Sequence, residues 1–219
     1  MQVRMPTWDE LFTQEKFRWR DAHQAIVEFV PELRAAGAQR ILDLGCGTGR
    51  HAVYLAGQGF DVWACDISAR GLTYARQWMA TEGLTAHLQY SDMTALPYHD
   101  GAFGGLVSTF VIYHGRLSDV RRTVAEIHRV LRPGGLALLT LISTRAGSYR
   151  QGREVEPDTF IRAVGNDSGI LHRYFDEDGV RRLLGDFEIL ALRLEESDTT
   201  DEAGSVCHHA HWCVQVCRP

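Results

Sequence analysis

The sequence predicts an α/β fold: a doubly wound, mostly parallel sheet with helices on both faces. Strand and helix signals alternate along most of the 219 residues, as they do where crossover helices join parallel strands. A short buried strand at 40–44 also runs directly into a glycine-rich turn and a helix. The 45% hydrophobic content over this length suits one core, so we expect residues 1–219 to form a single domain.

The N-terminal half contains the first three predicted strands. Residues 8–30 carry apolar and aromatic side chains at helical spacing, and Pro31 interrupts the pattern. This helical segment, within residues 1–35, either closes over a bound ligand as a lid or packs against the sheet. Ser68 is suited to cap a helix. Strands are predicted at 40–44, 60–65 and 86–90, and helices at 50–57 and 68–82.

The C-terminal half begins with the same alternation and then departs from it. Residues 143–175 contain four glycines and show no clear period. A structureless stretch of this length is typical of an active-site lid or a substrate-binding segment, so we expect a substrate-side insertion here. Strands are predicted at 105–112, 136–142, 187–194 and 209–217, helices at 118–131 (capped by Ser118) and 177–184, and an acidic loop after 194.

The strand–turn–helix segment at 41–50 is the candidate ligand site. Its glycines allow positive φ angles and a close approach of a ligand to the backbone. The spacing G-x-G-x-G differs from the dinucleotide pattern G-x-G-x-x-G, because Arg50 stands where the third glycine belongs, and no phosphate-loop lysine is near. Asp43, two residues before the first glycine, repels a pyrophosphate but suits a cation. S-adenosylmethionine carries an ammonium and a sulfonium group and no phosphate.

Two further carboxylates follow predicted strands. Asp66 ends the second strand, where a carboxylate can accept hydrogen bonds from both hydroxyls of a ribose. Asp92 follows the third strand and could accept from an adenine amino group, while the backbone of Met93 could reach a ring nitrogen. The alternatives are an ordinary helix cap or turn for Asp66 and an exposed turn for Asp92.

Five segments in this order resemble the class I S-adenosylmethionine-dependent methyltransferases of the methyltransferase-domain 11 and 25 type. They are ILDLGCGTGR, ACDIS, SDMTALPYHDGAF, VSTFVIYH and EIHRVLRPGGLALLTL, within residues 41–142. The resemblance implies a Rossmann-like sheet of seven strands whose last strand is antiparallel. One departure is Gly104, which follows Phe103 where the family commonly has Asp. The overall plan also resembles the tellurite-resistance and thiopurine-type branch.

The resemblance assigns cofactor contacts to the ends of the first four strands. The glycine loop and the end of the fourth strand hold the methionine part, the second strand the ribose and the third the adenine. The implied residues are Asp43, Gly45, Cys46, Gly47, Gly49 and Thr109 for methionine, Asp66 and Ile67 for ribose, and Asp92 and Met93 for adenine.

These observations predict an enzyme that transfers a methyl group from S-adenosylmethionine to a small molecule by in-line displacement, leaving S-adenosylhomocysteine. The net charge of −5 disfavours a nucleic-acid substrate, and no run of 18 apolar residues predicts a membrane span. Five cysteines, an odd number, indicate a reducing, cytoplasmic location. A non-catalytic cofactor-binding regulatory protein stays open, as does a dinucleotide oxidoreductase, which the glycine spacing disfavours.

Candidate catalytic side chains are few. Tyr113 and His114 follow the fourth strand, which faces the methyl group in the family, and His172 ends the insertion. A hydroxyl acceptor needs a general base, whereas a thiolate does not. His211 and Cys213 share a strand face with His209, but the spacing matches no usual zinc pattern, so we expect no metal. The methyl acceptor and the oligomeric state are not predicted.

Overall fold

The computed structural model describes residues 6–163, 165, 167–200, 204 and 206–219. Residues 1–5 of the expected lid lie outside the described residues, as do Val164 and Asn166 of the expected insertion.

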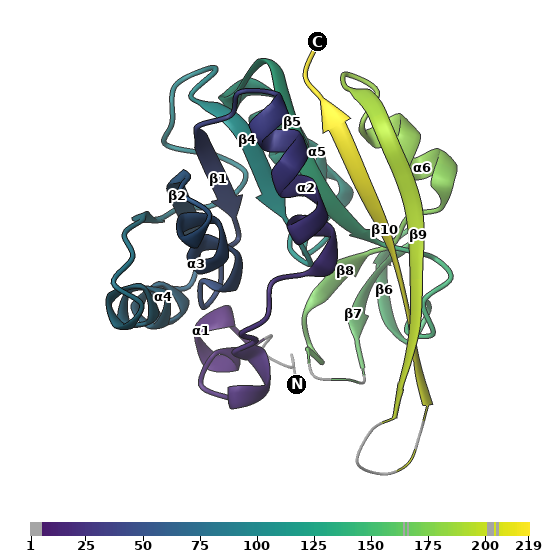
Figure 1. The fold of residues 1–219 in the computed structure, drawn as a ribbon. Coiled ribbons are helices and arrows are strands. Elements are labelled where there is room, and N and C mark those ends of the chain that lie inside the picture. Colours follow the sequence, from purple (N-terminus) through teal and green to yellow (C-terminus); the bar gives the residue numbers. More distant parts are fainter. Residues whose placement is uncertain (1–5, 164, 166, 201–203, 205) are drawn as a thin grey trace.

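A seven-stranded sheet in the order β3-β2-β1-β4-β5-β10-β9 forms the centre of the molecule (Figure 1). The first five of these strands are parallel, and β10 is antiparallel to both of its neighbours. The doubly wound, mostly parallel sheet with an antiparallel last strand is therefore confirmed. The strands are β1 (Arg40–Leu44), β2 (Asp61–Asp66), β3 (His87–Tyr90), β4 (Phe103–Ser108), β5 (Leu131–Ile142), β9 (Glu188–Thr200) and β10 (Val206–Cys217).

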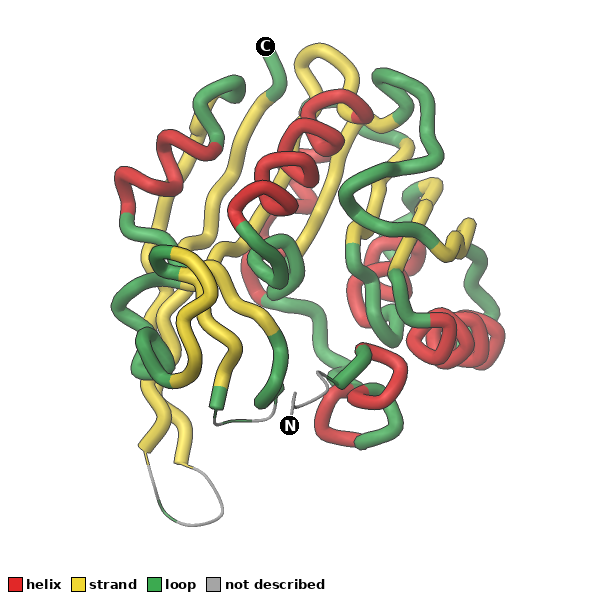
Figure 2. Tube along the Cα trace, turned by 180° about the vertical axis from the view of Figure 1, so that it is seen from behind, coloured by secondary structure: helices red, strands yellow, loops and turns green. Residues whose placement is uncertain are grey.

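Helices cover both faces of this sheet (Figures 1 and 2). Because side chains alternate along a strand, Ile41 packs with one helical layer and Leu42 with the other, in two separate clusters. One layer contains α2 (Gln24–Ala35), α3 (Arg50–Gly57) and α4 (Ala69–Thr81); the other contains α5 (Leu117–Val130) and α6 (Glu177–Leu183). None of the described helices is long and apolar enough to span a membrane.

The segment expected to be structureless contains a second sheet. Three antiparallel strands, β6 (Gly152–Glu156), β7 (Thr159–Arg162) and β8 (Leu171–Arg173), form it in that order. It lies below the carboxyl ends of the parallel strands, beside the β9–β10 hairpin (Figure 1). The expectation of no regular structure in 143–175 was wrong because such short strands are too brief to show a period.

The predicted N-terminal helix is also corrected. Residues 8–30 form α1 (Trp8–Leu11), a 3₁₀ turn η1 (Glu15–Phe17) and the start of α2, which contains Pro31 instead of ending there. Separate caps explain the division: Thr7 caps α1 in a capping box with Glu10, and the side chain of His23 accepts from Ala25 N at the start of α2.

Several other helix and strand ends differ from the predicted ones for local structural reasons. Strand β4 ends at Ser108 and not at 112, because Phe110 adopts a positive φ of 60°. The N-cap of α5 is Arg116, whose amide donates to Asp119, and not Ser118. Strand β5 starts at Leu131, and β9 extends through the acidic stretch predicted as a loop, because it pairs with β10 along most of its length.

The glycine that departs from the family pattern has a packing reason. A Cβ at Gly104 would lie 3.0 Å from Ala38 Cα, and one at Gly105 would lie 2.5 Å from Leu33 Cδ2. Helix α2 and the turn after it therefore approach β4 closely, and a side chain at either position would displace a neighbour. An aspartate at position 104 would require Ala38 to move by a few tenths of an ångström.

Candidate functional site

A cleft of about 2180 Å³ opens at the carboxyl ends of the parallel strands, where the strand order reverses between β1 and β4. In Figure 1 this end of the sheet points down, toward α1 and the three-stranded sheet. The cleft is larger than a usual single-ligand pocket, so it has room for two ligands side by side. Predicted site residues that line it are Gly45, Cys46, Gly47, Asp66, Ile67, Asp92, Met93, Thr109, Tyr113 and His114.

The glycine loop has backbone angles that side chains disfavour. Gly45, Gly47 and Gly49 have φ of +72°, +52° and +95°. A Cβ at Gly45 would lie 2.4 Å from Val111 Cγ1, and one at Gly47 would lie 3.0 Å from Phe12 Cζ. The loop thus passes close to neighbouring residues on both sides, and its backbone forms part of the cleft wall.

Asp43 lies behind the cleft surface, two residues before the loop. Its side chain is 1% exposed, and its Oδ2 atom has no hydrogen-bond partner among the described residues. Burial raises its pKa to about 7, although the positive charge of Arg50 opposes the shift. A buried acceptor without a donor fits a ligand that brings a cationic N–H group.

Asp66 joins the glycine loop to the turn after β2. Its Oδ2 accepts from Gly47 N and its Oδ1 from Ser68 N, both at 2.8 Å. Burial raises its pKa to about 6, against the lowering effect of these two bonds. Each carboxylate oxygen keeps a second lone pair, so the group can still accept from ligand hydroxyls. Ser68, not Asp66, is the N-cap of α4, and Ile67 is 47% exposed at the cleft wall.

Asp92 and Met93 line the cleft on the loop that follows β3. Asp92 Oδ1 accepts from both the amide and the hydroxyl of Thr94, at 2.8 Å each. This local turn holds the carboxylate in place and leaves Oδ2 available. The adenine contact predicted for these two residues requires the loop to be held still.

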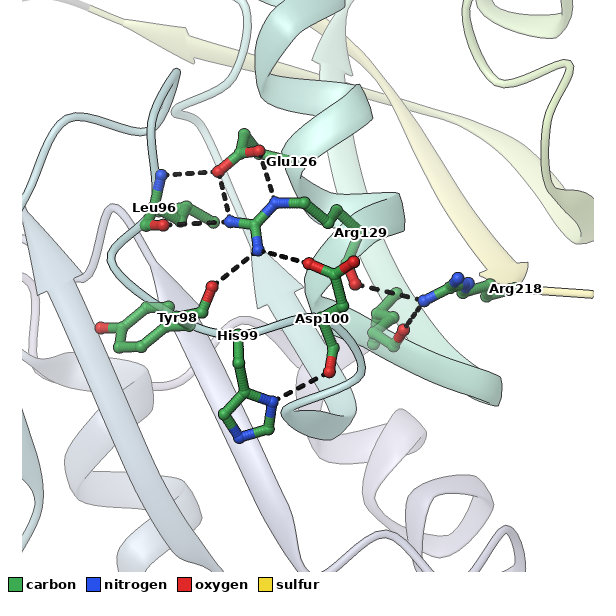
Figure 3. Close-up of polar contacts among 8 residues, drawn as sticks. Leu96, Tyr98, His99, Asp100, Glu126, Arg129 and Arg218 are labelled. Atoms are coloured by element: carbon green, nitrogen blue, oxygen red, sulfur yellow. Dashed lines mark hydrogen bonds and ion pairs between the residues drawn. The ribbon is translucent and has the colours of Figure 1, made fainter.

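Arg129 on α5 fixes the far part of this loop (Figure 3). Its guanidinium donates to the backbone oxygens of Leu96 at 3.0 Å and Tyr98 at 2.6 Å. It also contacts the carboxylates of Glu126 and Asp100, and Glu126 in turn accepts from Leu96 N at 2.7 Å. One arginine therefore satisfies two loop carbonyls that have no strand or helix partner.

The N-terminal segment covers the other side of the glycine loop. Asp9 on α1 accepts from Ser68 Oγ at 2.5 Å and from Arg70 N at 3.0 Å, which anchors α1 to the start of α4. Phe12 packs over Gly47, and Trp8 and Phe12 both line the cleft. Phe12 belongs to a small apolar cluster that includes Ile170 of the insertion, so the segment packs separately from the two main clusters.

Tyr113 and His114 lie deep on the side of the cleft that faces the three-stranded sheet. His114 Nε2 donates to Phe110 O at 3.0 Å, which leaves Nδ1 unprotonated and without a partner among the described residues. Burial lowers the pKa of His114 to about 3, so the ring is neutral. The ring centroids of Trp8 and Tyr113 lie 4.8 and 4.5 Å from that of His114.

His172 lies behind the cleft and has a different role. Its ring is fully buried, with Nε2 at 2.8 Å from Asp167 Oδ2 and Nδ1 at 3.2 Å from Ile170 O. Asp167 also pairs with Arg162 at 2.6 Å. His172 therefore has no free ring nitrogen to contact a substrate, and its ring packs on that of His114 at 4.5 Å.

Sequence reasoning missed several side chains of the cleft wall. Arg50, noted only as a departure from the dinucleotide pattern, packs against the rings of Trp19 and Phe110, which also contact each other. His23 and His211 also line the cleft and contact the Phe110 ring at 5.4 and 4.9 Å. Arg50 follows the last loop glycine directly, and His211 was considered only as a metal ligand, so neither was expected on the cleft wall.

The other candidates have ordinary structural partners. Within the described part of the chain, no three His, Cys, Asp or Glu side chains converge as a metal site requires. Arg145, at the start of the 143–175 segment, is mostly exposed and pairs with Glu196 at 3.1 Å. All five cysteines are free thiols.

Comparisons with known proteins agree with this geometry. A family model described as a methyltransferase domain matches residues 41–135. The protein YqeM of Bacillus subtilis, which bears a provisional methyltransferase name, is 30% identical over 74% of this chain and 64% of its own length. A demethylmenaquinone methyltransferase of Thermus thermophilus is 35% identical over 44% of each chain. The chain therefore spans less than two thirds of the length of these curated relatives.

Solved structures share the fold. A SAM-dependent methyltransferase from Methanosarcina mazei superposes with a TM-score of 0.73 at 23% identity, covering 90% of this chain and 98% of that one. TehB from Haemophilus influenzae superposes with a TM-score of 0.70 at 19% identity, covering 97% and 67%. At these identities the likeness shows the fold alone, so membership of the tellurite-resistance and thiopurine-type branch stays a prediction.

Proposed function

Residues 41–135 are a class I S-adenosylmethionine-dependent methyltransferase domain, and from this premise we propose that the chain methylates a small-molecule acceptor. The observation that carries the proposal is Asp66, which ties the glycine loop to β2 and keeps lone pairs free at the cleft wall. When bound, S-adenosylmethionine supplies an electrophilic methyl group. The protein supplies binding, orientation and exclusion of water.

We propose the cofactor contacts predicted from the sequence. The loop backbone at Gly45, Cys46 and Gly47 and the end of β4 at Thr109 hold the amino-acid part, and Asp43 attracts its ammonium group from behind the loop. Gly49 serves by setting the turn into α3, of which it is the N-cap. Asp66 and Ile67 hold the ribose, and Asp92 and Met93 hold the adenine. The unpartnered Oδ2 of Asp43 supports a cationic rather than a phosphorylated ligand.

The acceptor that the cleft fits best is a small, uncharged, planar molecule. Aromatic side chains cluster on the acceptor side, where Trp8, Phe110 and Tyr113 line the wall. Burial lowers the pKa values of His114 and His211 to about 3, so these rings add surface and hydrogen-bonding nitrogens without charge. The Thermus relative is named for demethylmenaquinone, whose naphthoquinone ring is planar and uncharged. The insertion at 143–175 forms the far wall.

For an acceptor with an O–H or N–H group, we propose His114 as general base. The bond from Nε2 to Phe110 O fixes the tautomer and leaves a lone pair on Nδ1, which an acceptor must reach beside the Leu171 backbone. The nitrogen is out of contact with solvent in this structure, so the groups packed around the ring must shift as the acceptor enters. Tyr113 positions the ring by packing on it. A thiolate acceptor would need no base.

The net charge and the free thiols bear on the class of substrate and on the location of the protein. A net charge of −5 supports a small-molecule substrate over a nucleic acid. The five free thiols support a reducing compartment such as the cytoplasm. The segment before α2 acts as the lid of the cleft, because Trp8 and Phe12 line it and Asp9 tethers it.

Calorimetry with S-adenosylhomocysteine tests the cofactor assignment. We expect low-micromolar binding, roughly 7–8 kcal/mol, and a loss of at least about tenfold in Asp66→Ala. Absence of binding in the unaltered protein would refute the proposal.

Turnover across a panel of phenols, quinols, amines and thiols tests the reaction itself. His114→Gln should lower turnover of phenols by about a hundredfold or more while thiol turnover and cofactor affinity change little. Cofactor binding without any turnover on the panel would instead favour a non-catalytic cofactor-binding protein.

A further inference from the structure

The β9–β10 hairpin continues past the end of the central sheet (Figure 1). Strand β5 ends at Ile142, opposite His211, and from there outward β10 pairs only with β9 among the described strands. Directly opposed residues of antiparallel strands lie on the same face. Three such pairs line the cleft, and we call them the hairpin ladder: His211 with Glu195, His209 with Ser197, and Cys207 with Thr199.

The inner end of the hairpin ladder meets the wall at which the proposed function places the acceptor. The His211 ring centroid lies 4.9 Å from that of Phe110 and 6.0 Å from that of Tyr113, and its Nε2 atom is 3.5 Å from Tyr113 Oη. A strand rises about 3.3 Å per residue, so the ladder leads about 13 Å outward from His211 to Cys207. A substituent on a ring bound at Phe110 and Tyr113 would therefore run along it.

The outer part of the hairpin ladder is exposed and polar. Ser197, Thr199, Cys207 and His209 are all exposed, and Thr199 Oγ1 lies 2.8 Å from His209 Nε2. Hydroxyl groups both donate and accept hydrogen bonds, and an imidazole adds a further donor or acceptor. Such a surface matches a ligand group that has several hydroxyls of its own.

The charged side chains beside the ladder already have partners of the opposite kind. The pairs are Arg162–Asp167 at 2.6 Å, Glu195–His23 at 3.5 Å and Glu196–Arg145 at 3.1 Å. An acidic ligand group would meet the carboxylates of Glu195 and Glu196 and an arginine that is already paired. A basic group would have to replace the existing partners. An uncharged group keeps all three contacts.

We propose that the hairpin ladder binds a neutral, polyhydroxylated substituent of the acceptor, such as a sugar, while the ring that carries the reactive group lies at Phe110 and Tyr113. The inference rests on the proposed function and extends it, because it makes the acceptor a ring with a polar tail. The inner wall then selects the ring, and the hairpin selects what is attached to it.

Titration calorimetry of the protein saturated with S-adenosylhomocysteine tests the inference. The probes are three phenols that each keep a free hydroxyl: hydroquinone, its monoglucoside arbutin, and 4-hexyloxyphenol, which has an apolar tail. The test variant combines Thr199→Val with His209→Ala, since these two side chains bond each other. The matched control is Asp198→Asn, on the opposite face of the same strand, where Asp198 pairs with His208. The melting temperature of each variant shows whether it is folded.

We expect the unaltered complex to bind arbutin about tenfold more tightly than hydroquinone, because the sugar adds two or so hydrogen bonds. The double variant should reduce this ratio to within about twofold while its affinity for hydroquinone stays unchanged. Asp198→Asn should leave the ratio as it is.

Three results would overturn the inference: arbutin binding no more tightly than hydroquinone, 4-hexyloxyphenol binding more tightly than arbutin, or a ratio that persists in the double variant. The second result would assign an apolar tail to the acceptor instead. Failure of the unaltered protein to bind S-adenosylhomocysteine at all would refute the proposed function, and that result is seen before any phenol is added.

Discussion

Replacing Arg129 with Met should loosen the loop that carries Asp92 and Met93 without touching the cleft. Arg129 makes two hydrogen bonds to loop carbonyls, at Leu96 and Tyr98, and ion pairs with two carboxylates (Figure 3). Methionine keeps much of the apolar length of the side chain and removes all of the donors.

The carbonyl bonds account for most of the expected loss. The Arg129 side chain is 30% exposed, so each charge-assisted bond to a carbonyl is worth about 1 kcal/mol. Asp100 is 77% exposed, so its ion pair adds a few tenths of a kcal/mol at most. The pair with Glu126 is an i,i+3 contact on the same helix and adds about 0.5 kcal/mol. The free energy of unfolding should therefore fall by about 2–3 kcal/mol.

For a chain of 219 residues this corresponds to a melting temperature lower by about 5–10 °C. Affinity for S-adenosylhomocysteine should fall by about three- to tenfold, because binding must now order the loop. Scanning calorimetry and titration calorimetry measure the two quantities. Arg182→Met is the control, since that arginine is 72% exposed and its Asp176 contact is 3.9 Å.

A melting temperature for Arg129→Met within about 1 °C of the control would refute the assignment of this network as the support of the loop. A large loss of stability with unchanged cofactor affinity would show that the loop holds its shape by other contacts. The reasoning about Asp92 and Met93 would then be wrong even though the network exists.

Two further predictions concern the glycine loop and the buried carboxylates. Gly45→Ala should destabilise the protein by about 2–4 kcal/mol, because φ at this position is +72° and the new Cβ would meet Val111 at 2.4 Å. Adding Val111→Ala removes the contact and should restore part of the melting temperature. If the melting temperature does not recover, the loss comes from backbone strain alone. Cofactor affinity should rise with pH from about 5.5 to 8, because burial raises the pKa of Asp66 to about 6 and that of Asp43 to about 7 while ligand donors favour the ionised forms. Titration calorimetry in buffers of different ionisation enthalpy should detect proton release on binding, which Asp66→Asn should diminish; a flat pH profile contradicts this.

The raised pKa values of Asp43 and Asp66 also determine how the stability of the ligand-free protein changes with pH. A carboxyl whose folded pKa exceeds its unfolded pKa favours folding most when it is protonated. The contribution of Asp66 and Asp43 is therefore present in acid and is lost as pH rises through about 6 to 7. At neutral pH the two ionised carboxylates therefore lower the folding stability of the ligand-free protein, and the proposed ligand contacts are the reason for keeping them.

Features encoded by neighbours in the chain were predictable. The turn at Gly45–Gly49 needs positive φ values at specific positions, so the local sequence carries its geometry. Ser68 was recognised as the cap of α4 because a cap bonds an amide three residues away. The strands around the loop follow from short apolar runs between such turns.

Features that depend on distant partners were not predictable. The side chain of His172 looked available, but Asp167 and Ile170 occupy both nitrogens, and nothing in the local pattern encodes that. The three-stranded sheet forms by pairing short segments with little periodicity. Whether Arg50 has an ion-pair partner likewise depends on which carboxylates the fold brings near it, and this cannot be predicted from a single sequence.

The two ends of the 143–175 segment lie side by side, and this has an evolutionary consequence. Ser143 and Phe175 form an isolated parallel bridge, with Phe175 N bonded to Ile142 O and Thr144 N bonded to Phe175 O, both at 3.0 Å. A segment whose two ends are neighbours can be exchanged for one of another length with little change in loop-closure entropy. The wall that faces the acceptor can therefore be inherited or grafted as a cassette, while the strands that hold the methyl donor stay constant.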